Sequence, residues 1–202
     1  MKKIDILCVI DMSGSMNIII EKAREGFNKF LNDQKESGNK IKFWLMFFDD
    51  NFYMPYNGVN IKKVEKLTKD TYYAGGTTSL YDSIGSCAEN YLDYIASKPK
   101  EKRADKTLFV ILTDGQENAS RVYHKEYIKN MVTEMREEFN CEFIFLGANQ
   151  DACFEAESMG INSSNAFNYA ATYDGITVAY ANISKSVNYY VNNDVKENLF
   201  QQ

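Results

Sequence analysis

ILCVIDMSGS, at residues 6–15, takes the chain from five apolar residues directly into a carboxylate and two hydroxyl side chains. A short apolar run bounded by turn residues is typical of a strand that is buried on both faces of a sheet. The side chains of Asp11, Ser13 and Ser15 stand at alternate positions, so they leave the end of the strand together and aim at one point. The stretch therefore predicts a central strand with a polar site at its carboxyl end.

Two further segments supply side chains of the same kind. The apolar run LFVIL at residues 108–112 ends in TDG, and the sequence GGTTS lies between the two runs at residues 75–79. The three segments together offer two strand-end aspartates, two loop serines and a threonine that follows two glycines. Oxygen-only ligand sets of this composition suit hard divalent cations. The three segments therefore predict a metal site.

These segments resemble the metal-ion-dependent adhesion site of von Willebrand factor type A domains, which combines Asp-x-Ser-x-Ser with a distant Thr and a distant Asp. The positions that match this motif are Asp11, Ser13, Ser15, Thr78 and Asp114. Counting back from the helix expected at Leu80 favours Thr78, and Thr77 is the alternative in the neighbouring register. The resemblance covers nearly the whole chain and is closest in kind to stand-alone prokaryotic or phage members of the family.

The resemblance implies a doubly wound α/β fold: a six-stranded, mostly parallel sheet of order 3-2-1-4-5-6, with one antiparallel edge strand and helices on both faces. It also implies one bound divalent cation, Mg²⁺ first, with Mn²⁺ and Ca²⁺ as alternatives. The serines would coordinate the ion directly, the threonine in some states, and the aspartates largely through water. An open position would accept an Asp or Glu carboxylate of a protein partner, and an ATPase-associated complex is one candidate partner.

Strand-like runs alternate with helical patterns along the chain, which by itself predicts a mostly parallel sheet covered by helices in one domain, residues 1–202. The expected strands cover residues 4–10, 41–48, 52–56, 107–112, 141–146 and 166–169. The expected helices cover residues 19–37, 80–95, 122–139, 152–159 and 173–191. The pair Asn57-Gly58 predicts a hairpin turn at an edge of the sheet.

Composition narrows the range of functions. The 202 residues are 45% hydrophobic and 25% charged, and the net charge of −5 arises from interspersed acidic and basic residues. The densest basic stretch, residues 98–106, also carries Glu101 and Asp105 and is interpreted as a solvated connection. We expect no nucleic-acid partner, because phosphate binding needs a concentrated basic face. We also expect no membrane association and a cytoplasmic location, because no apolar segment approaches about 20 residues and no secretory signal is visible.

Histidine and cysteine give no sign of a catalytic or zinc site. The only histidine, His124, falls in or near a predicted helix and is expected at the surface. The cysteines show neither CxxC spacing nor a nearby histidine, which favours small buried or half-buried thiols. They are Cys8, Cys87, Cys141 and Cys153.

Several residues next to the motif segments are candidates for a supporting role. Asp49 and Asp50 follow the second expected strand and are interpreted as a solvated turn. Glu117 and Asn118 are expected at the rim of the site, where partner specificity would reside. The tyrosines that flank the threonine loop are candidate partner contacts; they are Tyr72, Tyr73 and Tyr81.

Two other functions remain as alternatives. Haloacid-dehalogenase-like phosphatases also place an aspartate after the first strand, but they need a second aspartate two residues later as general acid, where this chain has Ser13. The chain has no G-x-S-x-G elbow and no P-loop lysine motif, so we expect no enzyme activity. The other alternative is a scaffold with a degenerate or purely structural metal site, and in the structural case metal removal would unfold the protein.

Overall fold

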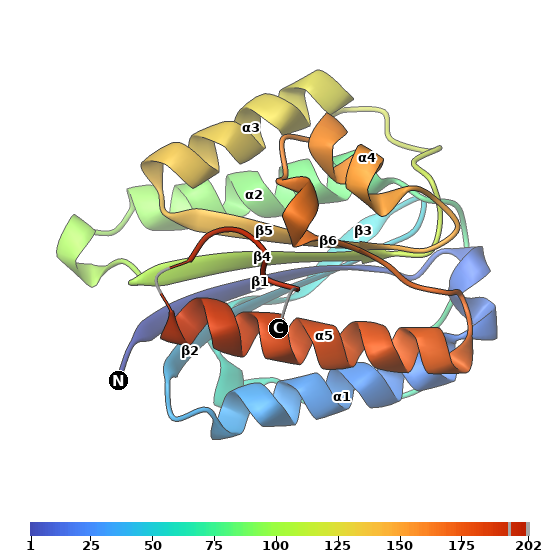
Figure 1. The fold of residues 1–202 in the computed structure, drawn as a ribbon, viewed down its shortest axis with the longest axis horizontal. Coiled ribbons are helices and arrows are strands. Elements are labelled where there is room, and N and C mark those ends of the chain that lie inside the picture. Colours follow the sequence, from blue (N-terminus) through green and yellow to red (C-terminus); the bar gives the residue numbers. More distant parts are fainter. Residues whose placement is uncertain (194, 201–202) are drawn as a thin grey trace.

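One sheet of six strands organises the protein in the computed structural model, which describes residues 1–193 and 195–200 (Figure 1). The strands are β1 (Lys3–Asp11), β2 (Lys40–Phe48), β3 (Phe52–Asn60), β4 (Lys106–Thr113), β5 (Cys141–Gly147) and β6 (Ala166–Asn168). Their order across the sheet is β3-β2-β1-β4-β5-β6; β3 is antiparallel to β2, and the other neighbouring pairs are parallel. The predicted strand order and the antiparallel edge strand are confirmed.

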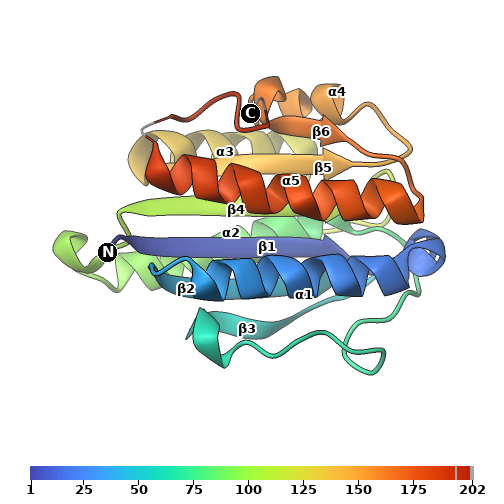
Figure 2. The same cartoon turned by 60° about the horizontal axis from the view of Figure 1, so that its bottom comes forward.

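Helices cover both faces of this sheet. They are α1 (Ile20–Glu36), α2 (Leu80–Ala96), α3 (Lys125–Glu138), α4 (Ala152–Ser158) and α5 (Tyr173–Asn192), with short 3₁₀ helices η1 (Gly14–Ile18), η2 (Ile61–Lys63), η3 (Lys100–Lys102) and η4 (Ser163–Asn165). Figure 2 shows α1 and α5 side by side over one face, and Figure 1 shows α2, α3 and α4 on the other. The doubly wound α/β class is therefore confirmed.

The central strand shows why its apolar run is continuous rather than alternating. In β1, Ile6 and Cys8 belong to the apolar cluster that includes α1 and α5, whereas Leu7 and Val9 belong to the cluster that includes α2 and α3. Both faces of β1 are thus removed from water, as expected for a parallel strand between two helical layers. Each buried aliphatic side chain of this kind stabilises the fold by roughly 1.5–3 kcal/mol.

One local prediction is wrong, because the chain does not turn at Asn57-Gly58. β3 continues through both residues, and the reversal from β2 occurs at residues 49–51. Gly58 has a φ of +62°, and a β-carbon there would lie 2.9 Å from Cζ2 of Trp44. The β2–β3 register also shifts between Phe43 and Leu45, which face this part of β3. The glycine therefore serves a β-bulge that packs closely over the indole, not a hairpin turn.

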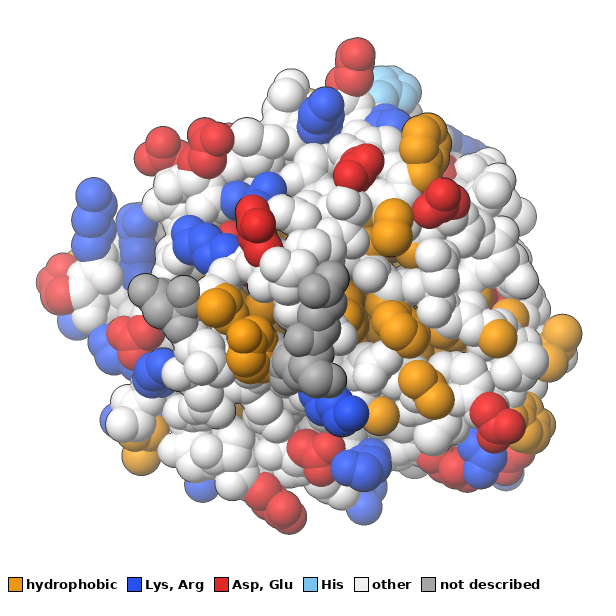
Figure 3. Space-filling model, viewed as in Figure 1, with side chains coloured by type: hydrophobic (Ala, Val, Ile, Leu, Met, Phe, Trp, Pro, Cys, Tyr) orange, Lys and Arg blue, Asp and Glu red, His pale blue; other side chains and the backbone are white. Residues whose placement is uncertain are grey.

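The surface carries mixed charges (Figure 3), and the cysteines are free thiols. Figure 3 shows acidic and basic side chains intermixed over one face, with apolar side chains gathered between α5 and β6. His124 is exposed and precedes α3, as predicted. All four cysteines are free; three are buried, but Cys153 is exposed, unlike the buried or half-buried thiol expected. Within residues 1–193 and 195–200, no helix is both long and apolar enough to cross a membrane.

The topology creates the position for a site between β1 and β4. The chain leaves β1 toward α1 on one face and leaves β4 toward α3 on the other face, although the two strands are neighbours. In a doubly wound sheet this divergence opens a crevice at the carboxyl ends of the strands. The motif segments at residues 11–15 and 113–115 begin at these two strand ends.

Candidate metal centre

Asp11 and Asp114 stand at the neighbouring ends of β1 and β4. The hydroxyl of Thr113 donates a hydrogen bond to Oδ2 of Asp11 at 2.6 Å, and the backbone N–H of Ser13 donates to Oδ1 at 2.7 Å. Both oxygens of Asp11 are therefore oriented by neighbours, and the residue is 0% exposed. The role of Thr113 was not predicted, because it depends on how the two strands pair.

The two motif serines connect these carboxylates. Oγ of Ser13 lies 3.1 Å from Oγ of Ser15, and the hydroxyl of Ser15 donates to Oδ1 of Asp114 at 2.5 Å. Ser15 belongs to η1, so the short 3₁₀ helix turns its side chain back toward β4. Hydrogen bonds thus link Asp11 at one strand end, through Ser13 and Ser15, to Asp114 at the other.

Thr78 approaches the same oxygen cluster from the threonine loop. A β-carbon built on Gly115 would lie 3.2 Å from Oγ1 of Thr78 and 3.6 Å from Oγ of Ser15, so both hydroxyls border one small space. Thr78 is 4% exposed, whereas Thr77 is exposed to solvent. Between the two registers left open by the sequence, the structure places Thr78 beside the predicted ligands.

Backbone hydrogen bonds hold the threonine loop against the first motif segment. The N–H of Gly75 donates to the carbonyl of Met12 at 2.8 Å, and the N–H of Gly14 donates to the carbonyl of Gly76 at 3.1 Å. Gly76 has a φ of +68°, and a β-carbon there would lie 2.0 Å from Oδ1 of Asp50. The positive φ is what favours glycine here, since the exposed Asp50 side chain could move away from a β-carbon.

That turn has a structural role of its own. The carbonyl of Asp49 accepts hydrogen bonds from the backbone N–H and the hydroxyl of Ser79, at 2.8 and 2.6 Å. The Asp49 carboxylate accepts from the N–H of Asn51, which closes the turn, and Asp50 is exposed. The predicted turn is present, and it anchors the threonine loop through its main chain.

Two buried tyrosines bind backbone carbonyls at the ends of β1 and β4. The hydroxyl of Tyr72 donates to the carbonyl of Asp11 at 2.5 Å, and the hydroxyl of Tyr169 donates to the carbonyl of Thr113 at 3.1 Å. Tyr72 is 0% exposed, so its expected role in partner contact is wrong. Tyr81 is also buried, and of the three tyrosines flanking the loop only Tyr73, 56% exposed, is available to a partner.

The residues expected at the rim turn out to hold the loops together. Asn118 binds the main chain of Thr78 twice, because its side-chain oxygen accepts from the Thr78 N–H and its own N–H donates to the Thr78 carbonyl, both at 3.0 Å. The Glu117 carboxylate accepts from the backbone N–H of Tyr81 at 3.0 Å, at the first turn of α2, and from Ser120. Glu117 is half-buried and Asn118 is exposed, so a position at the rim stays a prediction for both.

Asp82 explains why α3 begins later than predicted. Its carboxylate accepts hydrogen bonds from the backbone N–H groups of Arg121, Val122 and Tyr123, at 2.8 to 3.0 Å. These residues are therefore tied to α2, and α3 starts at Lys125 rather than at residue 122. This clamp fixes the loop that follows Asp114.

The electrostatics of the site favour a bound cation. Burial raises the pKa of Asp11 to about 6, against hydrogen bonds from Thr113 and Ser13, and the nearby charge of Asp114 adds to the rise. Burial also raises the pKa of Asp114. Across the part of the chain that the structure describes, neither carboxylate forms an ion pair with a basic residue. Buried carboxylates without a basic partner are costly, and a divalent cation among the hydroxyls would offset that cost.

The donor set is unusual in being rich in hydroxyls. Among the described residues there is no group of three or more His, Cys, Asp or Glu side chains placed to hold a metal. The predicted centre offers only two carboxylates, and its other side-chain oxygens come from Ser13, Ser15 and Thr78. Oxygen donors of this type fit Mg²⁺, Mn²⁺ or Ca²⁺.

Residues 5–178 match the sequence model of the von Willebrand factor type A domain. The chain belongs to this family. Domains of the von Willebrand type A family typically act in metal-dependent adhesion or protein interaction. Among curated proteins, none has a sequence that matches this chain.

Solved structures with the same fold include a matrix protein, a pilus adhesin and a domain of a pili tip protein. One is proximal thread matrix protein 1 from the mussel byssus with a zinc-occupied MIDAS motif, at 17% identity and a TM-score of 0.62 over 91% of this chain and 45% of that one. Another is the pilus adhesin SpaC from Lactobacillus rhamnosus GG, at 13% identity and a TM-score of 0.66 over 93% and 30% of the two chains. The vWF domain of the type V pili tip protein Mfa5 from Porphyromonas gingivalis has 9% identity and a TM-score of 0.65, over 95% and 97%.

These likenesses establish the fold. The present chain spans about half the length of the byssus protein, which also contains parts with no counterpart here. The activities of such larger proteins do not transfer with the fold. What the likenesses show is the fold, in which β1 and β4 are neighbouring parallel strands.

Proposed function

We propose that this protein is a metal-dependent protein-interaction module, whose site at the carboxyl ends of β1 and β4 binds an Asp or Glu side chain of a partner protein. The observation that carries the proposal is the convergence of two buried carboxylates and three hydroxyl groups from separate segments. Within the described residues, neither carboxylate has a basic partner. A purely structural role for one such residue, such as helix capping, is common. It does not account for all five meeting at one point.

The chain's own residues divide the work of holding an ion. Ser13, Ser15 and Thr78 would offer neutral hydroxyl oxygens, and Asp11 and Asp114 would contribute charge largely through bound water. A divalent cation held in this way would supply an electrophilic position for a partner carboxylate, because neutral ligands offset little of its charge. Mg²⁺ is the first choice, and the zinc in the MIDAS motif of the byssus protein adds Zn²⁺ to the ions worth testing.

The metal site is tested by calorimetric titration of chelator-treated protein with Mg²⁺ and Mn²⁺. We expect saturable binding at one site, and loss of that binding in the Ser13→Ala/Ser15→Ala variant. The matched control is Ser37→Ala/Ser97→Ala, which removes two hydroxyls at helix ends. Folded wild-type protein that binds neither ion, or a motif variant that binds as well as the control, would contradict the proposal.

The partner chemistry is tested separately with an array of peptides. Each peptide that carries an Asp or Glu is paired with the same peptide carrying Asn or Gln. We expect some acidic peptides to bind when Mg²⁺ or Mn²⁺ is present, and their amide counterparts and all peptides in EDTA to fail. Equal binding of acid and amide pairs would show that a partner carboxylate is not what the site recognises.

We propose no enzyme activity for this site. The position of the general acid in the phosphatase alternative is occupied by Ser13, whose hydroxyl lies against Ser15. The metal-loaded protein is therefore expected not to hydrolyse p-nitrophenyl phosphate above the rate of the Ser13→Ala/Ser15→Ala variant. Turnover by the wild type alone would reinstate the phosphatase alternative.

A further inference from the structure

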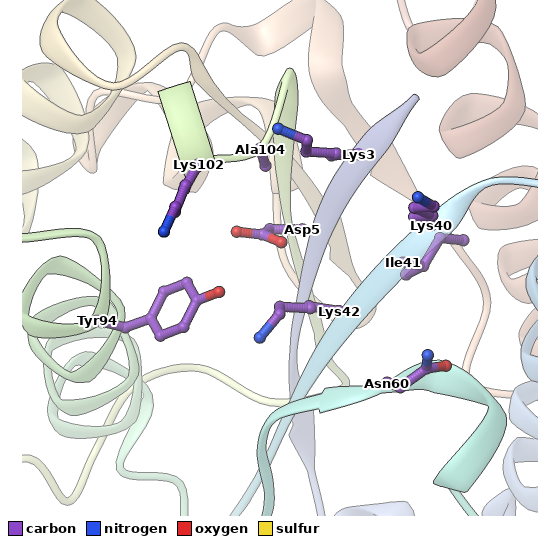
Figure 4. Close-up of a pocket in the computed structure, with 9 residues that line it drawn as sticks. All are labelled: Lys3, Asp5, Lys40, Ile41, Lys42, Asn60, Tyr94, Lys102 and Ala104. Carbon is purple, nitrogen blue, oxygen red and sulfur yellow. The ribbon is translucent and has the colours of Figure 1, made fainter. Parts of the chain in front are cut away.

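A cavity lies at the amino ends of β1 and β2, at the opposite ends of the strands from the metal centre (Figure 4). Its volume is about 420 Å³, which is within the range of small-molecule sites. Four lysines line it, and one carboxylate, that of Asp5, is the only acidic side chain among the lining residues. The lysines are Lys3, Lys40, Lys42 and Lys102.

Strand pairing places this charge pattern in one polar row across the sheet. Lys42 of β2 pairs with Asp5 of β1, and on its other side pairs with Asn60 of β3. Asp5 pairs in turn with Thr107 of β4. Lys102 reaches the same cavity from η3, and Tyr94 from the last turns of α2 (Figure 4). The cavity is thus lined from five elements, which are β1, β2, β3, α2 and η3.

The lysines of this site carry excess positive charge. Over residues 1–193 and 195–200, none of the four lining lysines forms an ion pair with a carboxylate. The Lys3 ammonium group instead donates to the carbonyl of Glu101 at 3.0 Å, and that of Lys42 lies 5.0 Å from the centre of the Tyr94 ring. In a chain of net charge −5, such a concentration of ammonium groups in one cavity suits an anionic ligand.

Asp5 gives the site a second, opposite requirement. The residue is 4% exposed, and its Oδ2 accepts a hydrogen bond from Tyr91 at 3.1 Å. Figure 4 shows its carboxylate directed into the cavity, with the phenol oxygen of Tyr94 and the ammonium groups of Lys42 and Lys102 around the same space. Burial raises the pKa of Asp5 to about 6, so it is still mostly ionised at neutral pH. A ligand must therefore offer a hydrogen-bond donor as well as negative charge.

We propose that this cavity binds a small organic phosphate that also carries hydroxyl groups, of the nucleotide or sugar phosphate class. The lysines hold the phosphate, and Asp5 accepts a hydrogen bond from a ligand hydroxyl. The Tyr94 hydroxyl is placed to donate to the phosphate or to the sugar. A bare inorganic anion meets the lysines but is repelled by Asp5, so it binds less tightly.

The first experiment is calorimetric titration with ADP, glucose 6-phosphate and pyrophosphate, at low salt and without divalent metal. We expect at least one organic phosphate to bind, more tightly than pyrophosphate, and the one that binds identifies the ligand class. The Lys42→Ala/Lys102→Ala variant should lose at least about tenfold in affinity, since charged hydrogen bonds are removed. The control Lys129→Ala/Lys185→Ala, which changes exposed lysines of α3 and α5, should bind as the wild type does.

The second experiment changes the acceptor. Asp5→Asn should weaken binding of the organic phosphate by about tenfold, because the charged hydrogen-bond acceptor is lost. The same change should strengthen binding of pyrophosphate, because the negative charge that repels it is removed. Thermal unfolding of each variant verifies that it is folded. The proposal is overturned if neither organic phosphate binds the wild type, if Lys42→Ala/Lys102→Ala binds as the control does, or if Asp5→Asn shifts both ligands in the same direction.

Discussion

The charged groups differ between the two ends of the parallel strands, which we call the carboxyl edge and the amino edge of the sheet. At the carboxyl edge, Asp11 and Asp114 are buried beside hydroxyl groups that suit a cation, and in the described part of the chain neither has a basic partner. At the amino edge, four lysines surround one carboxylate, that of Asp5, in a cavity that suits an anion. All strands but β3 run parallel, so they begin at the amino edge and end at the carboxyl edge. One doubly wound sheet can therefore carry two separate sites of opposite preference.

The separation of the two sites is tested most directly by changing one site at a time and measuring the binding of both ligands. Asp114→Ala should weaken Mg²⁺ binding by about 100-fold or more, the upper end of effects around metal sites, and leave the organic phosphate titration unchanged. Lys42→Ala/Lys102→Ala should do the reverse. Calorimetry of each variant with each ligand gives the four values needed. A variant that weakens both ligands would show that the two edges are coupled or that the fold is damaged.

The charge at the amino edge should also be visible in stability. The pKa of Asp5 in the folded state is about 6, above its ordinary value of 3.8, because burial outweighs the hydrogen bond from Tyr91 and the charge of Lys42. Folding thus favours the protonated form of Asp5. The contribution of this group to the free energy of unfolding is complete below pH 3.8 and is lost as the pH rises through 6.

Asp5→Asn removes this titrating group, so the effect can be measured as a difference in stability between the variant and the wild type. The free energy of unfolding of Asp5→Asn relative to wild type should rise by about 2–3 kcal/mol between pH 4 and pH 7. Urea unfolding at several pH values measures it. The exposed control Asp93→Asn should change stability by less than about 0.5 kcal/mol at each pH. A difference for Asp5→Asn that does not change with pH would refute the assigned shift.

At the carboxyl edge, the buried tyrosine hydroxyls should contribute to stability rather than to binding. Tyr72→Phe leaves the carbonyl of Asp11 without its donor inside the protein and should cost about 1–2 kcal/mol of unfolding free energy. Tyr73→Phe changes an exposed side chain and should cost almost nothing. Urea unfolding of both variants decides the point, and equal stabilities would mean that the Tyr72 hydrogen bond contributes little.

The threonine register can be resolved by a matched pair. Thr78→Ala removes the hydroxyl that borders Ser15 and Gly115 and should weaken Mg²⁺ binding about tenfold. Thr77→Ala changes an exposed neighbour and should bind Mg²⁺ as the wild type does. If calorimetry shows the loss in Thr77→Ala instead, the ion is held in the other register.

The smallest effect is expected from removing the metal itself. Apolar clusters pack on both faces of the sheet, and the five predicted ligands lie outside both of them. EDTA should therefore leave the far-ultraviolet circular dichroism spectrum unchanged. This separates a recognition site from a structural one. A large loss of helical signal on chelation would favour the alternative of a scaffold whose metal is needed for folding.

The sequence by itself determined the elements and the parts of the site. Continuous apolar runs predicted β1 and β4, and apolar residues spaced three and four apart predicted the helices. The five predicted ligands all came from the three motif segments. These signals are local, because a strand or an amphipathic helix is recognised from the residues within it. The family resemblance added the strand order, which local patterns cannot supply.

Only the tertiary structure decided which residues serve those parts. Tyr72 was predicted at a partner surface and instead binds the Asp11 carbonyl. Glu117 was predicted at the rim, and its hydrogen bond to the first turn of α2 was not foreseen. Gly58 was assigned to a turn, yet it allows the backbone to pass over Trp44. Similarly, no motif links Lys42 with Asp5, which meet through the pairing of β1 with β2. Such neighbours are set by strand register and layer packing, which join residues far apart in the chain and leave no local pattern.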